Sequence, residues 1–146
     1  MRDKIKFILL NLLYAVIIAI PFIIINFKVF SKSGQANLLQ ALSSILLILI
    51  WFAYSFVMGR KKKYSYIAVI LIFWGIGLVL FLLGNYIESL ILLTLPAIFL
   101  VIGPLYSIKY FFENPDNFTL SITCILIALI ASLLAFLLGR ILAKSK

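Results

Sequence analysis

Long apolar runs alternate along this chain with short polar interruptions. Apolar side chains dominate five stretches, which are separated by Gly, Asn, Pro or clustered cations. A helix needs roughly 20 apolar residues to cross about 30 Å of hydrocarbon, and each stretch meets or approaches this length. Lipid offers the backbone no hydrogen-bond partners, so a spanning segment must satisfy its own polar groups as a helix. The pattern predicts one all-α domain over residues 1–146, an integral membrane bundle of five transmembrane helices at 7–25, 38–58, 66–83, 87–108 and 118–138.

The composition excludes a soluble globular fold. Of the 146 residues, 66% are hydrophobic and 12% are charged, and the mean hydropathy is +1.27. Soluble domains contain about 45–50% apolar and about 25% charged residues. A domain this small buries only a modest fraction of its surface, so it could not hide so much apolar area from water. Strict alternation of apolar and polar residues is missing from the runs, which argues against a lipid-facing β-barrel.

The distribution of charge predicts an orientation. Lys and Arg number 13, Asp and Glu number 4, and the formal net charge is +9. The cations cluster beside apolar runs, at the N-terminus and at Arg60, Lys61, Lys62 and Lys63, which is typical of cytoplasmic flanks rather than of a nucleic-acid surface. We expect the plasma membrane, a cytoplasmic N-terminus, and contact of the 60–63 cluster with anionic lipid headgroups. No nucleic-acid partner is expected.

The fourth stretch allows two paths, because Pro96 and Gly103-Pro104 interrupt it. If it crosses as one helix, the inner flanks hold eight cations and the outer flanks five. If it enters from outside and returns without crossing, the counts become ten and three. The second path gives the stronger positive-inside bias, but re-entrant backbone must be covered by protein or line water, and this chain is short. We favour five crossing helices, with four helices plus one re-entrant segment as the alternative.

Few residues could support catalysis or bind a metal. The chain has no His and a single Cys, Cys124, which excludes His-based acid–base pairs and triads and makes a zinc site improbable. Glu88 is the one acid inside an apolar stretch, where capping of a helix start explains it. Glu113 and Asp116 lie in the most polar loop. We therefore expect no enzymatic activity, no cofactor and no metal, with a lipid-directed enzyme using these three acids as a minor hypothesis.

Two patterns of uncharged residues suggest helix contacts. Gln40, Ser43 and Ser44 share one helical face by their spacing and, with Glu88, could line a polar groove, although hydrogen bonding between helices is the simpler interpretation. In the last stretch, small residues recur every three or four positions and would let another helix approach closely, either within the chain or from a partner. Gly75 and Gly77 are candidates for the matching contact. The small-residue face consists of Cys124, Ala128, Ser132, Ala135 and Gly139.

These observations favour a non-catalytic multi-pass protein that acts through helix–helix contacts. Such a protein could be an accessory, stabilising or immunity-type subunit of a membrane complex, with a partner membrane protein or a second copy of itself as the contact. The alternative is a small oligomeric transporter or channel for a neutral or lipid-like solute, in which the polar residues at 40, 43 and 44 would line the path.

Overall fold

Every regular element in the described part of the chain is helical. The structure is a computed structural model that describes residues 2–32, 34–113 and 115–143, together with their side chains except those of Lys32, Glu88, Ile91 and Leu93. The elements in chain order are α1 (Arg2–Lys32), α2 (Leu38–Arg60), α3 (Ser65–Ile70), a π-helical stretch (Leu71–Ile76), α4 (Gly77–Tyr86), a 3₁₀ turn (Glu88–Leu90), α5 (Ile91–Ala97), a second π-helical stretch (Ile98–Ile102), a 3₁₀ helix (Gly103–Phe111) and α6 (Asn117–Leu142).

Five helical stretches are long and apolar enough to cross a membrane, so the predicted all-α membrane bundle is confirmed at this level. Each stretch overlaps one of the five predicted ranges. They are Arg2–Ser31, Leu38–Arg60, Ser65–Tyr86, Thr94–Phe111 and Asn117–Leu142.

Helix α2 begins at a capping box, which explains why the chain turns sharply after α1. The Asn37 side-chain oxygen accepts from the Gln40 backbone N–H at 2.9 Å, and the Gln40 side-chain oxygen accepts from the Asn37 N–H at 3.1 Å. Helix α6 begins in a similar way, because Asp116 accepts from the Thr119 N–H at 2.8 Å. These side chains satisfy amide groups that have no partner inside the helix.

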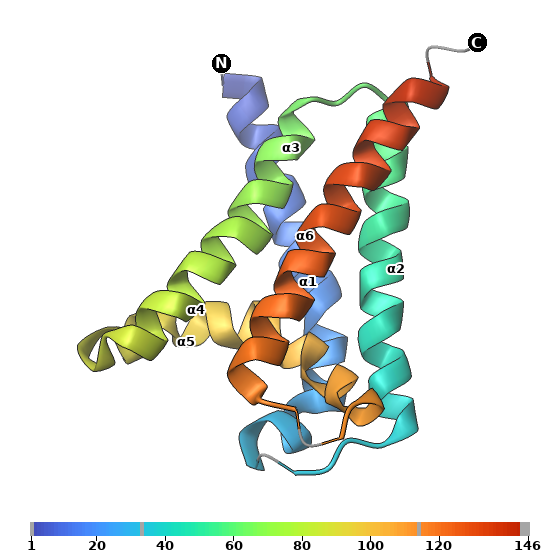
Figure 1. The fold of residues 1–146 in the computed structure, drawn as a ribbon. Helices are drawn as coiled ribbons and strands as arrows, with labels where there is room; N and C mark the ends of the chain where they lie inside the picture. The colour runs from blue at the N-terminus through green and yellow to red at the C-terminus, as the bar shows by residue number, and fades with distance from the viewer. Residues whose placement is uncertain (1, 33, 114, 144–146) are drawn as a thin grey trace.

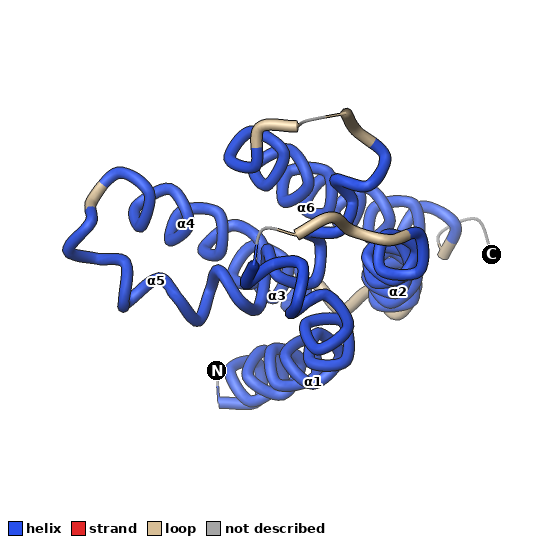
Figure 2. Tube along the Cα trace, turned by 90° about the horizontal axis from the view of Figure 1, so that it is seen from below, coloured by secondary structure: helices blue, strands red, loops and turns tan. Residues whose placement is uncertain are grey.

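The long helices run between two ends of the bundle (Figure 1). Helix α1 leads away from the end that holds the N-terminus, α2 returns to it, and α3 with α4 leads away again. Helix α6 then returns, so α1 begins and α6 ends at the same end of the molecule. Viewed along the bundle in Figure 2, α4 and α5 project to one side of the group formed by α1, α2 and α6.

The fourth apolar stretch stays in the half of the bundle where α1 ends and α6 begins (Figure 1). The Phe99 ring lies 5.3 Å from the Phe30 ring near the end of α1, and Tyr106 lies 5.4 Å from the same ring. The helix changes from π to 3₁₀ geometry at Gly103-Pro104. Residues from Val101 to Ser107 are all buried, so α1, α2 and α6 supply the protein cover that such backbone requires.

Glycines let α4 and the fourth stretch pack closely. A Cβ at Gly77 would lie 3.3 Å from Cβ of Val101, and one at Gly84 would lie 3.0 Å from Cβ of Thr94. Residue 77 lies close to residue 101, and residue 84 lies close to residue 94, so α4 and the fourth stretch form an antiparallel hairpin. These two glycines therefore set the spacing between its arms.

Aromatic side chains fill the core between α2, α3 and α6. Trp74 is fully buried, and the Trp51 ring lies 5.2 Å from it in an edge-to-face arrangement. Tyr66 and Phe136 extend this cluster with rings 6.5 Å apart. Such pairs gain about 0.5–1.5 kcal/mol beyond their buried area. The largest side chains thus hold the middle of the bundle, while smaller ones line the α2–α6 contact.

Candidate functional site

The most connected polar cluster lies where the fourth stretch meets α1 and α2. Asn26 and Ser44 are fully buried. The Asn26 amide nitrogen donates to the Pro104 carbonyl at 3.1 Å, and the Ser44 hydroxyl donates to the same carbonyl at 2.6 Å. Both side chains thus hydrogen-bond to one backbone carbonyl near the start of the 3₁₀ helix. This cluster attaches the backbone of the fourth stretch to α1 and α2.

Residues 40, 43 and 44 of the predicted polar groove form hydrogen bonds with other parts of the chain. The Ser43 hydroxyl donates to the Gln40 carbonyl at 2.7 Å and lies 3.2 Å from the Asn26 amide nitrogen. The Gln40 amide nitrogen donates to the Ile25 carbonyl at 3.1 Å, which ties α2 to α1. The structure therefore brings residues 40, 43 and 44 together as contacts between helices. The side chain of Glu88, the fourth predicted groove residue, lies outside the described side chains.

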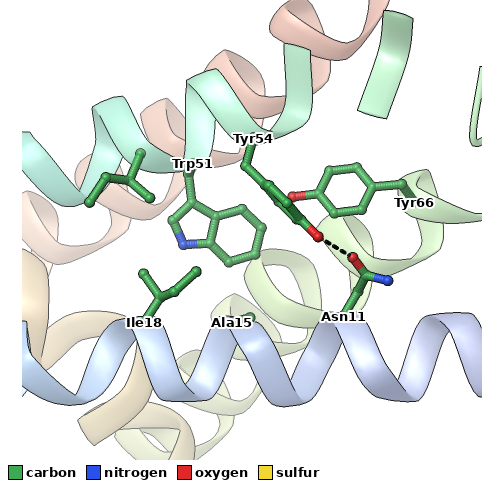
Figure 3. A pocket seen from close by; sticks show the side chains of 7 residues that line it. Asn11, Ala15, Ile18, Trp51, Tyr54 and Tyr66 are labelled. Carbon is green, nitrogen blue, oxygen red and sulfur yellow. Dashed lines mark hydrogen bonds between the residues drawn. The ribbon is translucent and has the colours of Figure 1, made fainter. Parts of the chain in front are cut away.

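A second polar contact lies in the other half of the bundle, between α1, α2 and α3 (Figure 3). The Tyr54 hydroxyl donates to the Asn11 side-chain oxygen at 2.7 Å, and the Asn11 amide donates to the Phe7 carbonyl at 2.7 Å. The adjoining cavity, lined also by Trp51 and Tyr66, has a volume of about 10 Å³. That is about the smallest volume that holds one water molecule, so this cavity is too small for an organic ligand.

The small-residue face of α6 is used inside the chain. All five of its predicted residues are buried, and α6 packs along α2. A Cβ at Gly139 would overlap the Phe56 carbonyl oxygen, and one at Gly59 would overlap the Phe136 carbonyl oxygen. The two backbones thus touch at reciprocal glycines. The expected match with Gly75 and Gly77 is wrong, because Gly77 contacts Val101 and a Cβ at Gly75 would face open space.

Sequence reasoning missed two residues that the structure makes central. Asn26 and Gly59 each lie one residue beyond a predicted span, 7–25 and 38–58. A usable signal existed for Gly59, since Ser55 and Gly59 form a small i, i+4 pair on the buried face of α2. Asn26 lies one turn after Phe22 inside an apolar helix, and its amide also donates to the Phe22 carbonyl at 2.9 Å.

The strongest charged surface lies at the end where α1 begins and α6 ends (Figure 1). Arg60, Lys61, Lys62 and Lys63 are all exposed between α2 and α3. Lys62 has a positive φ of 54°, in the left-handed region, within the turn that joins α2 to α3. The Arg140 guanidinium lies 5.0 Å from the Tyr64 ring centre, bringing a cation of α6 beside the loop. The predicted tail cations Lys144 and Lys146 lie outside the described residues.

Metal ligands do not gather anywhere in the described part of the chain, where no group of three or more His, Cys, Asp or Glu residues could hold an ion. Cys124 is buried as a free thiol on the α6 face. Glu113 and Asp116 are exposed at the end opposite the cationic loop. No family model, curated protein or solved structure matches this chain, so the functional inference rests on the chain itself.

Proposed function

We propose that this chain is a non-catalytic subunit of a membrane complex, which it stabilises through helix–helix contacts. The observation that supports this proposal is that its buried polar and small residues contact other helices of the same chain. Asn26, Ser43 and Ser44 bond to one another or to the fourth stretch, and Gly59 and Gly139 join α2 to α6. A bundle organised in this way offers its partners its outer surface rather than an internal path or reaction centre.

Helix α1 is the best candidate for the contact with a partner. In its apolar window 22% of the residues are buried, compared with 33–39% in the other four candidate spans. Its outward side chains, such as Ile17 and Ile24, are 52% and 69% exposed. Lipid covers such a surface without difficulty, but a partner helix could cover it equally well, because side-chain packing drives association inside a bilayer. The partner is a second membrane protein or another copy of this chain.

The proposed orientation places both termini in the cytoplasm of a cell with a plasma membrane of anionic lipids. The cations at the starts of α1 and α3 and at the end of α6 would then face the cytoplasm, in accord with the positive-inside bias. Exposed Lys and Arg gain about 1 kcal/mol each near an anionic surface. The loop at 60–63 is therefore proposed to contact lipid headgroups. This contact is enough to fix the topology, and it needs no protein partner.

Site-specific photo-crosslinking in native membranes tests the proposal. A photoreactive residue at Ile24, which is 69% exposed, should crosslink to a defined membrane protein, whereas one at the fully buried Ile125 should not. Crosslinks from Ile24 to lipid alone, together with a monomeric protein after mild detergent extraction, would contradict an accessory role. Solute flux in liposomes that contain only this chain would favour the alternative of a small transporter.

A further inference from the structure

A pocket opens at the end of the bundle opposite the cationic loop, next to the start of α6. Its volume is about 330 Å³, within the range of about 300–1,000 Å³ that is usual for small-ligand sites. Side chains from α1, α4, the fourth stretch and α6 converge on it, among them Phe30, Phe81, Ile98, Ile102, Asp116 and Phe118. Because four separate parts of the chain build this concavity, tertiary packing creates it and no single helix face does.

Aromatic and aliphatic side chains make up most of the pocket lining, which we call its floor, and Asn85, Asn117 and Ser121 add uncharged polar groups. The rings of Phe81 and Phe118 lie 5.5 Å apart, and those of Phe30 and Tyr106 lie 5.4 Å apart. Ring faces carry a negative quadrupole and attract ammonium groups. Tyr106 shows this attraction within the chain, since Lys109 Nζ lies 4.3 Å from its ring centre, although Lys109 itself lines a neighbouring cleft. The floor therefore suits a ligand that is both apolar and cationic.

Asp116 supplies the negative charge at the rim. One carboxylate oxygen accepts from the Thr119 N–H at 2.8 Å, and the residue is exposed. Hydrogen bonds from Thr119, first from its side chain and then from its backbone, lower the pKa of Asp116, with no described cation contributing. The carboxylate is thus ionised at neutral pH and lacks an ion-pair partner among the described residues. This charge distinguishes the rim from an ordinary lipid-facing groove.

We propose that this pocket binds a small lipophilic ammonium ion, with the charge beside Asp116 and the apolar body against the Phe81 and Phe118 rings. A free solute is the proposed source, because a volume of about 330 Å³ matches the whole of a small organic cation. The negative charge at the rim and the apolar floor together favour a ligand that is both cationic and lipophilic. An uncharged apolar solute would gain nothing from the carboxylate, and an anion would be repelled by it. This inference is independent of the proposed accessory role and needs no partner protein.

Equilibrium dialysis of the full chain in non-ionic detergent tests the assignment. Benzyltrimethylammonium is the probe, and phenylmethanesulfonate, an anion of similar size, is its matched control. The protein should retain the cation and not the anion. Asp116→Asn keeps a good helix cap while removing the charge, and it should weaken cation retention about fivefold. Glu113→Gln removes a carboxylate that lines the neighbouring cleft instead, and it should leave retention unchanged.

A second pair of variants examines the aromatic floor. Phe118→Leu removes a ring from the pocket and should weaken binding of the cation about threefold, whereas Phe52→Leu on the outside of α2 should not. Equal retention of cation and anion would overturn the proposal, as would full binding in folded Asp116→Asn protein. Displacement of the probe by added phosphatidylcholine would overturn the assignment to a free solute, since a lipid headgroup would then supply the ammonium group.

Discussion

The contact between α2 and α6 can be tested by adding a single methyl group. In Gly139→Ala, the new Cβ would overlap the Phe56 carbonyl oxygen and lie 3.0 Å from the Arg60 backbone nitrogen. Ordinary contact begins at 3.4 Å, and backbone atoms cannot rotate aside as a flexible side chain can. The two helices must therefore separate by on the order of 1 Å at this point.

The expected loss of stability follows from that separation. A gap of about 0.5–1 Å forfeits a quarter to a half of each dispersion contact, and overpacking a dense interface typically costs about 1–3 kcal/mol. The buried neighbours Ser132 and Ala135 belong to the same face and would lose contacts as well. We expect Gly139→Ala to lower the free energy of unfolding by about 2 kcal/mol, which is roughly a 30-fold change in the folding equilibrium.

Gly75→Ala is the matched control, because a Cβ there would meet nothing within 4 Å. Alanine favours helix over glycine by up to about 1 kcal/mol, so this variant should be neutral or slightly more stable. Titration of both proteins with sodium dodecyl sulfate in mixed micelles, followed by far-ultraviolet circular dichroism, measures the difference. If Gly139→Ala unfolds at the same detergent fraction as Gly75→Ala, the close backbone contact does not exist and the reasoning fails.

Three further predictions concern the fourth stretch and the start of α6. Asn26→Leu removes the amide that bonds to the Pro104 carbonyl and should cost about 1–2 kcal/mol, given about 0.6 kcal/mol for an average interhelical bond. Amide hydrogen exchange of residues 105–108 should quicken, and unchanged exchange would disprove the anchoring role. Reporters fused to either terminus should appear on the same side of the membrane, and opposite sides would refute the path drawn for residues 94–111. Folding lowers the pKa of Asp116, so its contribution to stability is present above its ordinary pKa of 3.8 and is lost as the pH falls through the folded-state pKa. Asp116→Asn should therefore make the melting temperature depend less on pH at acidic pH. An unchanged pH dependence would count against the cap.

The fourth stretch shows where sequence reasoning reached its limit. Length and apolarity allow residues 87–108 to span, and Pro96 does not forbid a spanning helix. The stronger charge bias pointed to a re-entrant path, yet whether the short chain could cover the backbone was unknown. The structure shows protein cover from residues far apart in sequence, because Asn26 and Ser44 both donate to the Pro104 carbonyl. Such partners cannot be identified from the local pattern.

The α6 face and the pocket at the start of α6 illustrate the same limit. The spacing of Cys124, Ala128 and Gly139 predicts a close helix contact, but spacing does not name the partner, and Gly59 rather than Gly75 supplies the match. From the sequence, Asp116 or Asn117 could cap the helix that follows them, and the structure shows that Asp116 does so. Its position beside Phe81 and Phe118 depends on how the α4–α5 hairpin folds against α6.

The sequence by itself determined that the apolar segments belong in lipid, that they are helical, approximately where the helices end, and where the cations cluster. These follow from local physics, since apolar runs partition into lipid, lipid imposes helices, and loop cations resist transfer across a bilayer. Only the tertiary structure decided which glycines meet, where the backbone of the fourth stretch is held, and which side chains surround the 330 Å³ pocket. Those outcomes depend on matching shapes between residues distant along the chain, and shape complementarity is a property of the packed bundle.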